Sequence, residues 1–352
     1  MKAHSSCFMS EEFVTIKNSS KTNADVNELK KETGKEFRQV NSPNLDLHNF
    51  DFTKKIFYHP EKIVAYKNGE RPFPTTIEID LTNRCNHRCS FCFYAEHIGV
   101  EADKPSVDTK VLKERLIEAK KLGTKAISFT GGGEPTIHPE YFQVIEFAKK
   151  LGFDIGTITN GSVITSRNVD GMINNLQWVR LSIAGGDAES YKKVQGVDQF
   201  EKVVNNLKLL AKRKSELNSN LNIGARILVT PENVDTLTNF AEIIKDLNID
   251  YCQLAPDQFT TDKGVFWNSE KTQNAFKEVN KILTGNKIKL LTTTYMDTQE
   301  SLDKPRTCYA HFFMITITAE GDLTFCKNAR GEKDFNIGNM YEKSLEEIWN
   351  DT

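Results

Sequence analysis

The sequence predicts an α/β fold built around a parallel sheet, and three observations support this. Apolar residues make up 38% of the 352-residue chain, which is enough to bury a core. Short β-rich runs and helical stretches alternate along the middle of the chain. Helices between successive strands favour parallel pairing through right-handed crossovers. The expected strands are residues 76–81, 126–130, 154–159, 178–183, 222–230 and 251–255.

The first expected strand shows the period-two pattern of a half-buried strand, with Ile77, Ile79 and Leu81 alternating with polar neighbours. Helical spacing then recurs between the strands, for example in residues 141–151 and 234–244, where apolar positions fall every three or four residues. Six such units can form a doubly wound sheet or part of a βα barrel. The periodicity alone does not choose between these two architectures.

Composition and charge exclude several classes of function. Lys and Arg total 46 against 48 Asp and Glu, and a net charge near zero argues against a broad nucleic-acid-binding surface. No run of about 18 apolar residues occurs, so no transmembrane helix is expected, and the first ten residues show no secretory signal. Seven cysteines is an odd number, and three of them lie within eight residues. This usage favours a metal or redox site in a reducing cytoplasm over a disulfide framework.

Four segments are expected along the chain. Residues 1–70 are polar and rich in Lys, Asn, Ser and Glu, which predicts a partly disordered extension or, alternatively, a segment that packs near the substrate. Residues 71–260 hold the six βα units, and residues 261–304 form a helical connection. Residues 305–352 form a small module, in which two apolar runs flank a turn at 319–322 as a β-hairpin and a short helix follows.

Three cysteines crowd into the stretch that directly follows the first expected strand. Cys85, Cys89 and Cys92 are separated by three and then two residues. A compact loop with this spacing can place three thiolates around one corner of an iron–sulfur cube. With only three local thiolates one iron lacks a nearby protein ligand. An open metal position is where a substrate or cofactor binds in catalytic sites.

A zinc site and buried structural cysteines are the alternatives for this cluster. Structural zinc sites usually have four ligands, so His87 or His97 would have to supply the fourth. Buried structural cysteines need no particular spacing. The arrangement directly after a strand therefore favours the iron–sulfur site.

A glycine run follows the second expected strand, where Gly131, Gly132 and Gly133 precede Glu134. Consecutive glycines let the backbone approach a ligand closely and present its polar groups, which suits an amino or carboxylate group. A glycine turn is often only a turn. This one, however, lies at the carboxyl end of a strand, one βα unit after the cysteine loop, and barrel chemistry gathers at such ends.

Together, the cysteine loop, the Gly-Gly-Glu motif and the six βα units resemble the radical S-adenosylmethionine (SAM) superfamily over residues 74–256. The resemblance implies a partial (βα)6 TIM-type barrel, here with a small C-terminal β-hairpin module and a polar N-terminal extension. It implies a [4Fe–4S] cluster on Cys85, Cys89 and Cys92, whose open iron chelates the amino and carboxylate groups of SAM. It also implies reductive cleavage of SAM to a 5′-deoxyadenosyl radical, which abstracts a hydrogen atom from the substrate.

The resemblance assigns SAM contacts to residues near the strand ends. Gly132, Gly133 and Glu134 would border the amino group of SAM, and Phe91 matches the aromatic position beside the adenine. Three further polar residues are candidate contacts, with an ordinary strand-end role as their alternative: Asn160, Ser182 and Arg226.

The C-terminal module resembles the SPASM or twitch extension of radical SAM enzymes over residues 307–349. That extension carries auxiliary iron–sulfur clusters in many members, so Cys308 and Cys326 are candidate ligands. Two thiolates cannot complete a four-thiolate cluster, and His311, Cys252 or a partner would have to contribute. The alternative is a shortened module in which Cys308 and Cys326 are packing residues.

Cys252 lies in the sixth expected strand, apart from the other cysteines. A buried packing role is the usual one for such a residue. The alternative is a catalytic role as hydrogen-atom donor to a substrate radical, which the resemblance suggests because some radical SAM epimerases use a cysteine in this way.

The substrate preferred by these observations is a small, sugar-like molecule that undergoes oxidation, epimerisation or rearrangement, with a peptide as the alternative. An electron donor such as flavodoxin or ferredoxin is the expected partner, and neither nucleic acid nor a membrane is expected. A noncatalytic iron–sulfur electron carrier is a further alternative. The glycine run disfavours it, because electron transfer has no use for an open iron.

Overall fold

The strands define the fold. The structure, a computed structural model, describes residues 58–95, 98–99, 103–257, 265–292, 309–326 and 329–351. The strands in these residues are β1 (Thr76–Ile79), β2 (Ala126–Phe129), β3 (Asp154–Thr159), β4 (Trp178–Ser182), β5 (Asn222–Val229), β6 (Tyr251–Pro256), β7 (Lys289–Thr292), β8 (Met314–Ile317), β9 (Asp322–Thr324) and β10 (Asn336–Asn339).

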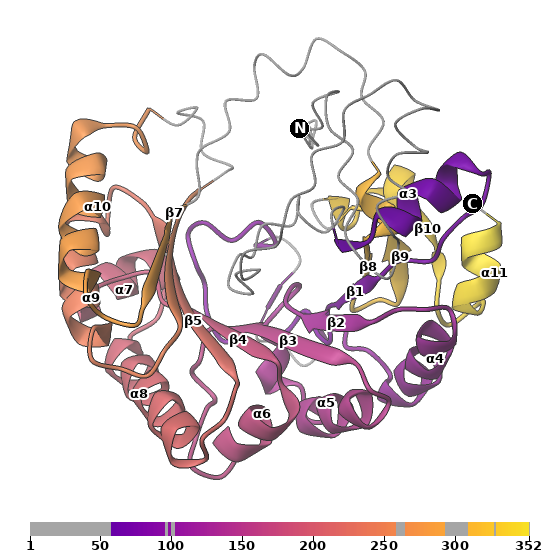
Figure 1. Ribbon diagram of the computed structural model, residues 1–352, viewed down its shortest axis with the longest axis horizontal. Helices are drawn as coiled ribbons and strands as arrows, with labels where there is room; N and C mark the ends of the chain where they lie inside the picture. Colours follow the sequence, from indigo (N-terminus) through magenta and orange to yellow (C-terminus); the bar gives the residue numbers. More distant parts are fainter. Residues whose placement is uncertain are drawn as a thin grey trace, which may run out of the picture.

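These strands form one sheet in the order β10-β9-β8-β1-β2-β3-β4-β5-β6-β7. Pairing is parallel from β8 through β1 to β7, and β9 and β10 are added antiparallel. Figure 1 shows the sheet bending into an arc with helices on its outer side. Strands β7 and β10 end the sheet without pairing to each other, so the fold is a partial barrel, as the resemblance implied.

All six predicted strands are present, with ends within a few residues of those expected. Strand β7 was missed, because residues 261–304 were expected to form only a helical connection. Four residues are too few to show alternation, and β7 is defined instead by its pairing with β6, where Tyr251 faces Lys289.

The helices cover the convex face of the sheet (Figure 1). They are α4 (Thr109–Lys121), α5 (Tyr141–Lys150), α6 (Val169–Asn175), α7 (Ala188–Gln195), α8 (Phe200–Glu216), α9 (Leu237–Ile244) and α10 (Glu270–Leu283). Local capping explains where several begin. The side chain of Asp108 accepts a hydrogen bond from the backbone N–H of Lys110 at 2.8 Å before α4, and Ser269 caps α10 in the same way.

The two faces of the sheet differ in chemistry. One set of alternating residues faces the helices and joins a single apolar core, as do Ile77 and Ile79 in β1 and Val179 and Leu181 in β4. The residues between them face the concave side, and many of these are polar. Examples on the concave side are Glu78, Asp80, Ser128, Arg180, Ser182, Arg226 and Gln253.

The C-terminal module extends the barrel sheet. Strand β8 pairs with β1, and β8 and β9 form the predicted hairpin around Gly321, whose φ of 87° suits glycine. The final helix, α11 (Leu345–Asn350), begins at a capping box of Ser344 and Glu347. It contacts α4 through a hydrogen bond of 2.8 Å from the backbone N–H of Glu346 to Glu118.

One helix, α3 (Pro60–Lys67), lies inside the segment 1–70 that was expected to be a polar extension. Its proline occupies the first turn, where a missing N–H costs nothing. Residues 1–57 lie outside the described residues, so the prediction for them is not tested. Within the described ranges, no helix is both long and apolar enough to cross a lipid bilayer.

Candidate functional site

The three clustered cysteines lie in one loop that follows β1, as predicted. Each of Cys85, Cys89 and Cys92 is half-buried. Backbone hydrogen bonds hold the loop against α7: the N–H of Arg88 donates to the carbonyl of Gln195 at 3.1 Å, and that of Ser90 donates to Val194 at 2.8 Å. The loop is therefore fixed on the barrel.

Burial and mutual repulsion both act on the three thiols. The pKa of Cys89 is raised to about 12, mainly by burial and in part by the charges of Cys92 and Cys85. Burial likewise raises the pKa of Cys85 to about 11 and that of Cys92. Ligand binding as thiolates therefore requires a metal centre that displaces the protons, as metal sites in general do.

The arrangement fits an iron–sulfur cluster better than a single zinc ion. Among the described residues, no three His, Cys, Asp or Glu side chains gather as a site for a single metal ion. In a cluster each thiolate binds a different iron, so convergence on one point is not needed. Both ring nitrogens of His87 are engaged, Nε2 with Tyr191 at 2.9 Å and Nδ1 with Asn160 at 2.9 Å. His97 lies outside the described residues.

The glycine run packs directly on the cysteine loop. The N–H of Gly133 donates to the carbonyl of Thr82 at 2.7 Å, and that of Glu134 donates to the carbonyl of Arg84 at 2.8 Å. A Cβ on Gly133 would lie 1.9 Å from the Arg84 carbonyl oxygen, and Gly132 has a φ of 66°. Glycine is therefore required at both positions, by close approach at one and by conformation at the other.

The Glu134 side chain stabilises this junction from inside the protein. Its buried carboxylate accepts hydrogen bonds from Thr136, from the Thr159 hydroxyl at 2.6 Å and from the Asn160 N–H at 2.7 Å. Burial raises the pKa of Glu134, and these donors oppose the shift. The carboxylate is thus satisfied by the chain itself, and it supports the glycine run from inside the protein.

Asn160 joins β3 to the cysteine loop. Its Nδ2 donates to Asn86 at 2.7 Å, while its Oδ1 accepts from the Ser162 hydroxyl at 2.7 Å. Phe91 is half-buried within the loop. The structure therefore brings Asn160, Phe91, the cysteines and the glycine run together.

Ser182 and Arg226 lie opposite each other on β4 and β5. The Ser182 carbonyl accepts from Gln195 at 3.2 Å. Burial lowers the pKa of Arg226 to about 9, and the nearby Arg180 charge adds to this. Within the described ranges, the Arg226 guanidinium has no hydrogen bond or ion pair, and its buried Nε lacks a partner.

The other two cysteine predictions have different outcomes. Cys252 is 1% exposed and belongs to the apolar core, on the helix-facing side of β6. We therefore leave it out of the proposed site. Cys326 is half-buried after β9, and Cys308 lies outside the described residues, so an auxiliary cluster on this pair stays a prediction.

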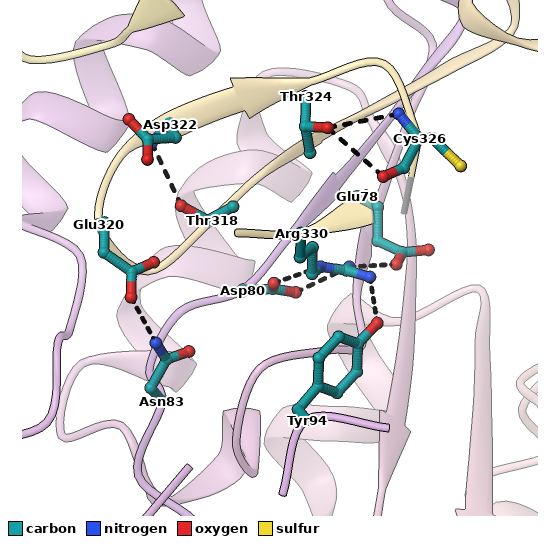
Figure 2. A network of polar contacts seen from close by, with 10 residues as sticks. All are labelled: Glu78, Asp80, Asn83, Tyr94, Thr318, Glu320, Asp322, Thr324, Cys326 and Arg330. Carbon is teal, nitrogen blue, oxygen red and sulfur yellow. Dashed lines mark hydrogen bonds and ion pairs between the residues drawn. The ribbon is translucent and has the colours of Figure 1, made fainter. Parts of the chain in front are cut away.

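Arg330, which the sequence analysis missed, connects the C-terminal module to the barrel (Figure 2). Its guanidinium is buried and donates to Glu78, to Asp80 and to the hydroxyl of Tyr94. Its Nε lies 2.5 Å from the Asp80 carboxylate. Tyr94 lies two residues after Cys92, the last cysteine of the loop. Arg330 therefore contacts the end of the cysteine loop as well as β1. No sequence motif marks this arginine.

One guanidinium balances only one of the two buried carboxylates. Burial raises the pKa of Asp80 to about 7, with Arg330 opposing the shift and Glu78 adding to it. Burial lowers the pKa of Arg330, but Asp80 and Glu78 outweigh burial and raise it. The three groups form a compact buried ion cluster.

A loop of three thiols docked on a glycine run, at the strand ends of a partial βα barrel, is the arrangement expected of an iron–sulfur enzyme. The profile of the radical SAM superfamily matches residues 79–244, and the profile of the SPASM iron–sulfur cluster-binding domain matches residues 308–352. The chain belongs to the radical SAM superfamily, is a radical SAM enzyme and carries a C-terminal SPASM domain. Its cofactors are SAM and a [4Fe–4S] cluster.

Curated relatives support the same family. The chain is 27% identical over 300 residues to a tungsten-containing aldehyde ferredoxin oxidoreductase cofactor-modifying protein from Pyrococcus furiosus, covering 78% of this chain and 80% of that protein. It is 29% identical over 191 residues to the GTP 3′,8-cyclase of Chlorobaculum tepidum, covering 51% of this chain and 53% of the cyclase.

Solved structures share the fold. Streptococcus suis SuiB bound to S-adenosylmethionine superposes with a TM-score of 0.63 at 17% identity, covering 93% of this chain and 75% of SuiB. The anSMEcpe structure with bound AdoMet gives a TM-score of 0.56 at 20% identity, covering 78% of this chain and 81% of that chain. At these identities the similarity concerns the fold alone.

Arg330→Met tests the ion cluster. Removing the guanidinium leaves Glu78 and Asp80 buried without a cation, so the free energy of unfolding should fall by about 3–5 kcal/mol in urea unfolding. Lys343→Met in the same module removes an exposed ion pair with Asp351 and should leave the free energy of unfolding nearly unchanged, because solvent screens such a pair. Equal losses for the two variants would contradict the account.

Proposed function

We propose that the chain binds the [4Fe–4S] cluster through Cys85, Cys89 and Cys92 and acts on a small, sugar-like molecule. When bound, the reduced cluster and SAM together supply the 5′-deoxyadenosyl radical that removes a hydrogen atom from the substrate. The observation that best supports this proposal is the packing of the cysteine loop against the glycine run. This packing fixes three thiols beside a backbone that only glycine allows.

Different residues of the chain are proposed to bind the cluster and SAM. Three thiols would leave one iron of a [4Fe–4S] cluster without a protein ligand, and the backbone of Gly132 and Gly133 would offer polar groups to the SAM bound there. The unpaired Arg226 guanidinium suits the carboxylate of SAM, because a planar cation matches a carboxylate bidentately. Asn160 and the Glu134 carboxylate hold the loop and the glycine run in place.

Two further contacts complete the proposed SAM site. The Ser182 hydroxyl lies across from Arg226 in the paired strands and is placed to reach the ribose or carboxylate. Phe91 offers an aromatic face to the adenine. Both assignments follow the resemblance to the family, and they are supported by the place of Phe91 in the cysteine loop and by the pairing of Ser182 with Arg226.

A small polar substrate is favoured by the concave face of the sheet. That face carries the buried charged groups of Arg180 and Glu78 and the half-buried amide of Gln253. The named activities of the two curated relatives, cofactor modification and GTP cyclisation, also concern small molecules. A peptide is the second candidate, since SuiB, with the same fold, has been solved bound to the precursor peptide SuiA.

An electron donor such as flavodoxin or ferredoxin is the proposed partner, because reductive cleavage needs one electron from outside the chain. We place the protein in the cytoplasm, since half-buried thiols that hold a cluster need a reducing compartment. The five cysteines in the described ranges are all free of disulfides.

The cluster assignment is tested by iron content. Cys85→Ala, Cys89→Ala and Cys92→Ala, alone or together, should lose most of the reconstituted iron and sulfide at this site and the binding of SAM. Cys252→Ala, in the core, should keep both. Iron and sulfide analysis with equilibrium SAM binding measures this. Unchanged iron and SAM binding in the triple variant would place the cluster elsewhere.

The substrate class is tested by deuterium transfer. Cells of the organism that encodes the protein are grown in deuterated medium, and their extract is split into small-molecule and peptide fractions. Each fraction is given to the reduced enzyme with unlabelled SAM, and mass spectrometry follows deuterium in 5′-deoxyadenosine. Label from the small-molecule fraction is expected. Label from the peptide fraction alone would contradict the proposed substrate class.

A further inference from the structure

Two arginines occupy the concave face of the sheet, and among the described residues neither has a carboxylate within ion-pair distance, although the charge of Glu78 acts on Arg180 from further away. Arg180 lies in β4, two residues before Ser182, and Arg226 lies opposite Ser182 in β5. Arg180 is 9% exposed. It donates through Nη1 to Gln253 of β6 at 3.2 Å, a bond that crosses β5 and so places both residues on one face of the sheet.

Neither guanidinium is neutralised within the described part of the chain. The buried Nε of Arg180 and that of Arg226 lack hydrogen-bond partners, and no carboxylate lies within ion-pair distance of either. Gln253 offers Arg180 only a neutral oxygen. Burial lowers the pKa of both arginines, and the charge of Arg180 lowers that of Arg226 further.

Such an arrangement is costly to the folded protein. A buried cation without an anion loses its hydration and gains little in return, and two neighbouring cations repel. The buried guanidinium of Arg330, by contrast, forms ion pairs with two carboxylates on the same face, those of Glu78 and Asp80. Unfavourable arrangements of this kind persist where a ligand supplies the missing partner.

We propose that Arg180 is a substrate-binding residue that takes an anionic oxygen group, carboxylate or phosphate, of the substrate. The inference rests on the proposed function, in which Arg226, paired with Ser182 at the end of β4, serves SAM. Arg180 lies two residues further back in β4 from that end. A guanidinium is the group best matched to a planar carboxylate or to a phosphate.

The test compares wild type with Arg180→Met, a neutral side chain of similar length, in reconstituted enzyme with SAM present. Thermal unfolding is measured in sodium phosphate, sodium succinate and sodium chloride at equal ionic strength. Phosphate or succinate should raise the melting temperature of wild type by about 2 °C or more above chloride, and should not do so for the variant. The effective anion identifies the group as phosphate or carboxylate. The exposed Arg167→Met serves as control and should respond as wild type does.

A second readout separates binding from structure. In chloride, Arg180→Met should melt at or above the wild-type temperature, because an unpaired buried charge has been removed. A large loss of stability would make Arg180 structural and overturn the proposal. So would equal anion responses in the two proteins, or no response in either.

SAM affinity keeps this inference distinct from the proposed function. The SAM dissociation constant of Arg180→Met should stay within about twofold of wild type, because Arg180 is assigned to the substrate and not to SAM. A twofold change corresponds to well under 1 kcal/mol of binding free energy. A larger loss would assign Arg180 to the SAM site and overturn the inference. A wild-type protein that carries iron but does not bind SAM would overturn the proposed function instead.

Discussion

The buried ion cluster of Arg330 is the interaction on which the site depends. It holds the C-terminal module against β1, the strand that leads into the cysteine loop, and it contacts Tyr94 beyond that loop. A Cβ on Gly131 would lie 2.7 Å from the Asp80 carboxylate, so the glycine run also packs on the buried ion cluster. One buried charge group therefore fixes both motifs and the module at once.

The concave face uses arginine in two opposite ways. Arg330 is paired, and its loss exposes two buried carboxylates to the full cost of isolation. Within the part of the chain that the structure describes, Arg180 and Arg226 have no carboxylate within ion-pair distance, and the folded protein bears the cost of burying their charges. A buried arginine with a carboxylate partner is typical of a structural role. A buried arginine without such a partner is typical of a ligand-binding role. This contrast separates the support of the site from its binding surface.

Much of the architecture follows from the sequence, because it rests on local patterns. The six strands, the hairpin around Gly321 and the cysteine loop are marked by periodicity, turn residues and spacing. Strand β7 and helix α3 were not predicted, since both are short and are defined by neighbours distant in sequence. Arg330 and Arg180 carry no motif, and their roles depend on which side chains the sheet brings beside them. The Glu134 carboxylate was expected near the ligand, and its actual donors became visible only in three dimensions.

The central claim is that the cysteine loop and the glycine run form a site that cleaves SAM. The most direct measurement is 5′-deoxyadenosine formation by protein reconstituted anaerobically with iron and sulfide, then given SAM and a strong reductant. The account predicts product from wild type and none from the Cys85→Ala, Cys89→Ala, Cys92→Ala triple variant. No product from a wild-type protein that carries its cluster, or equal product from both proteins, would contradict it.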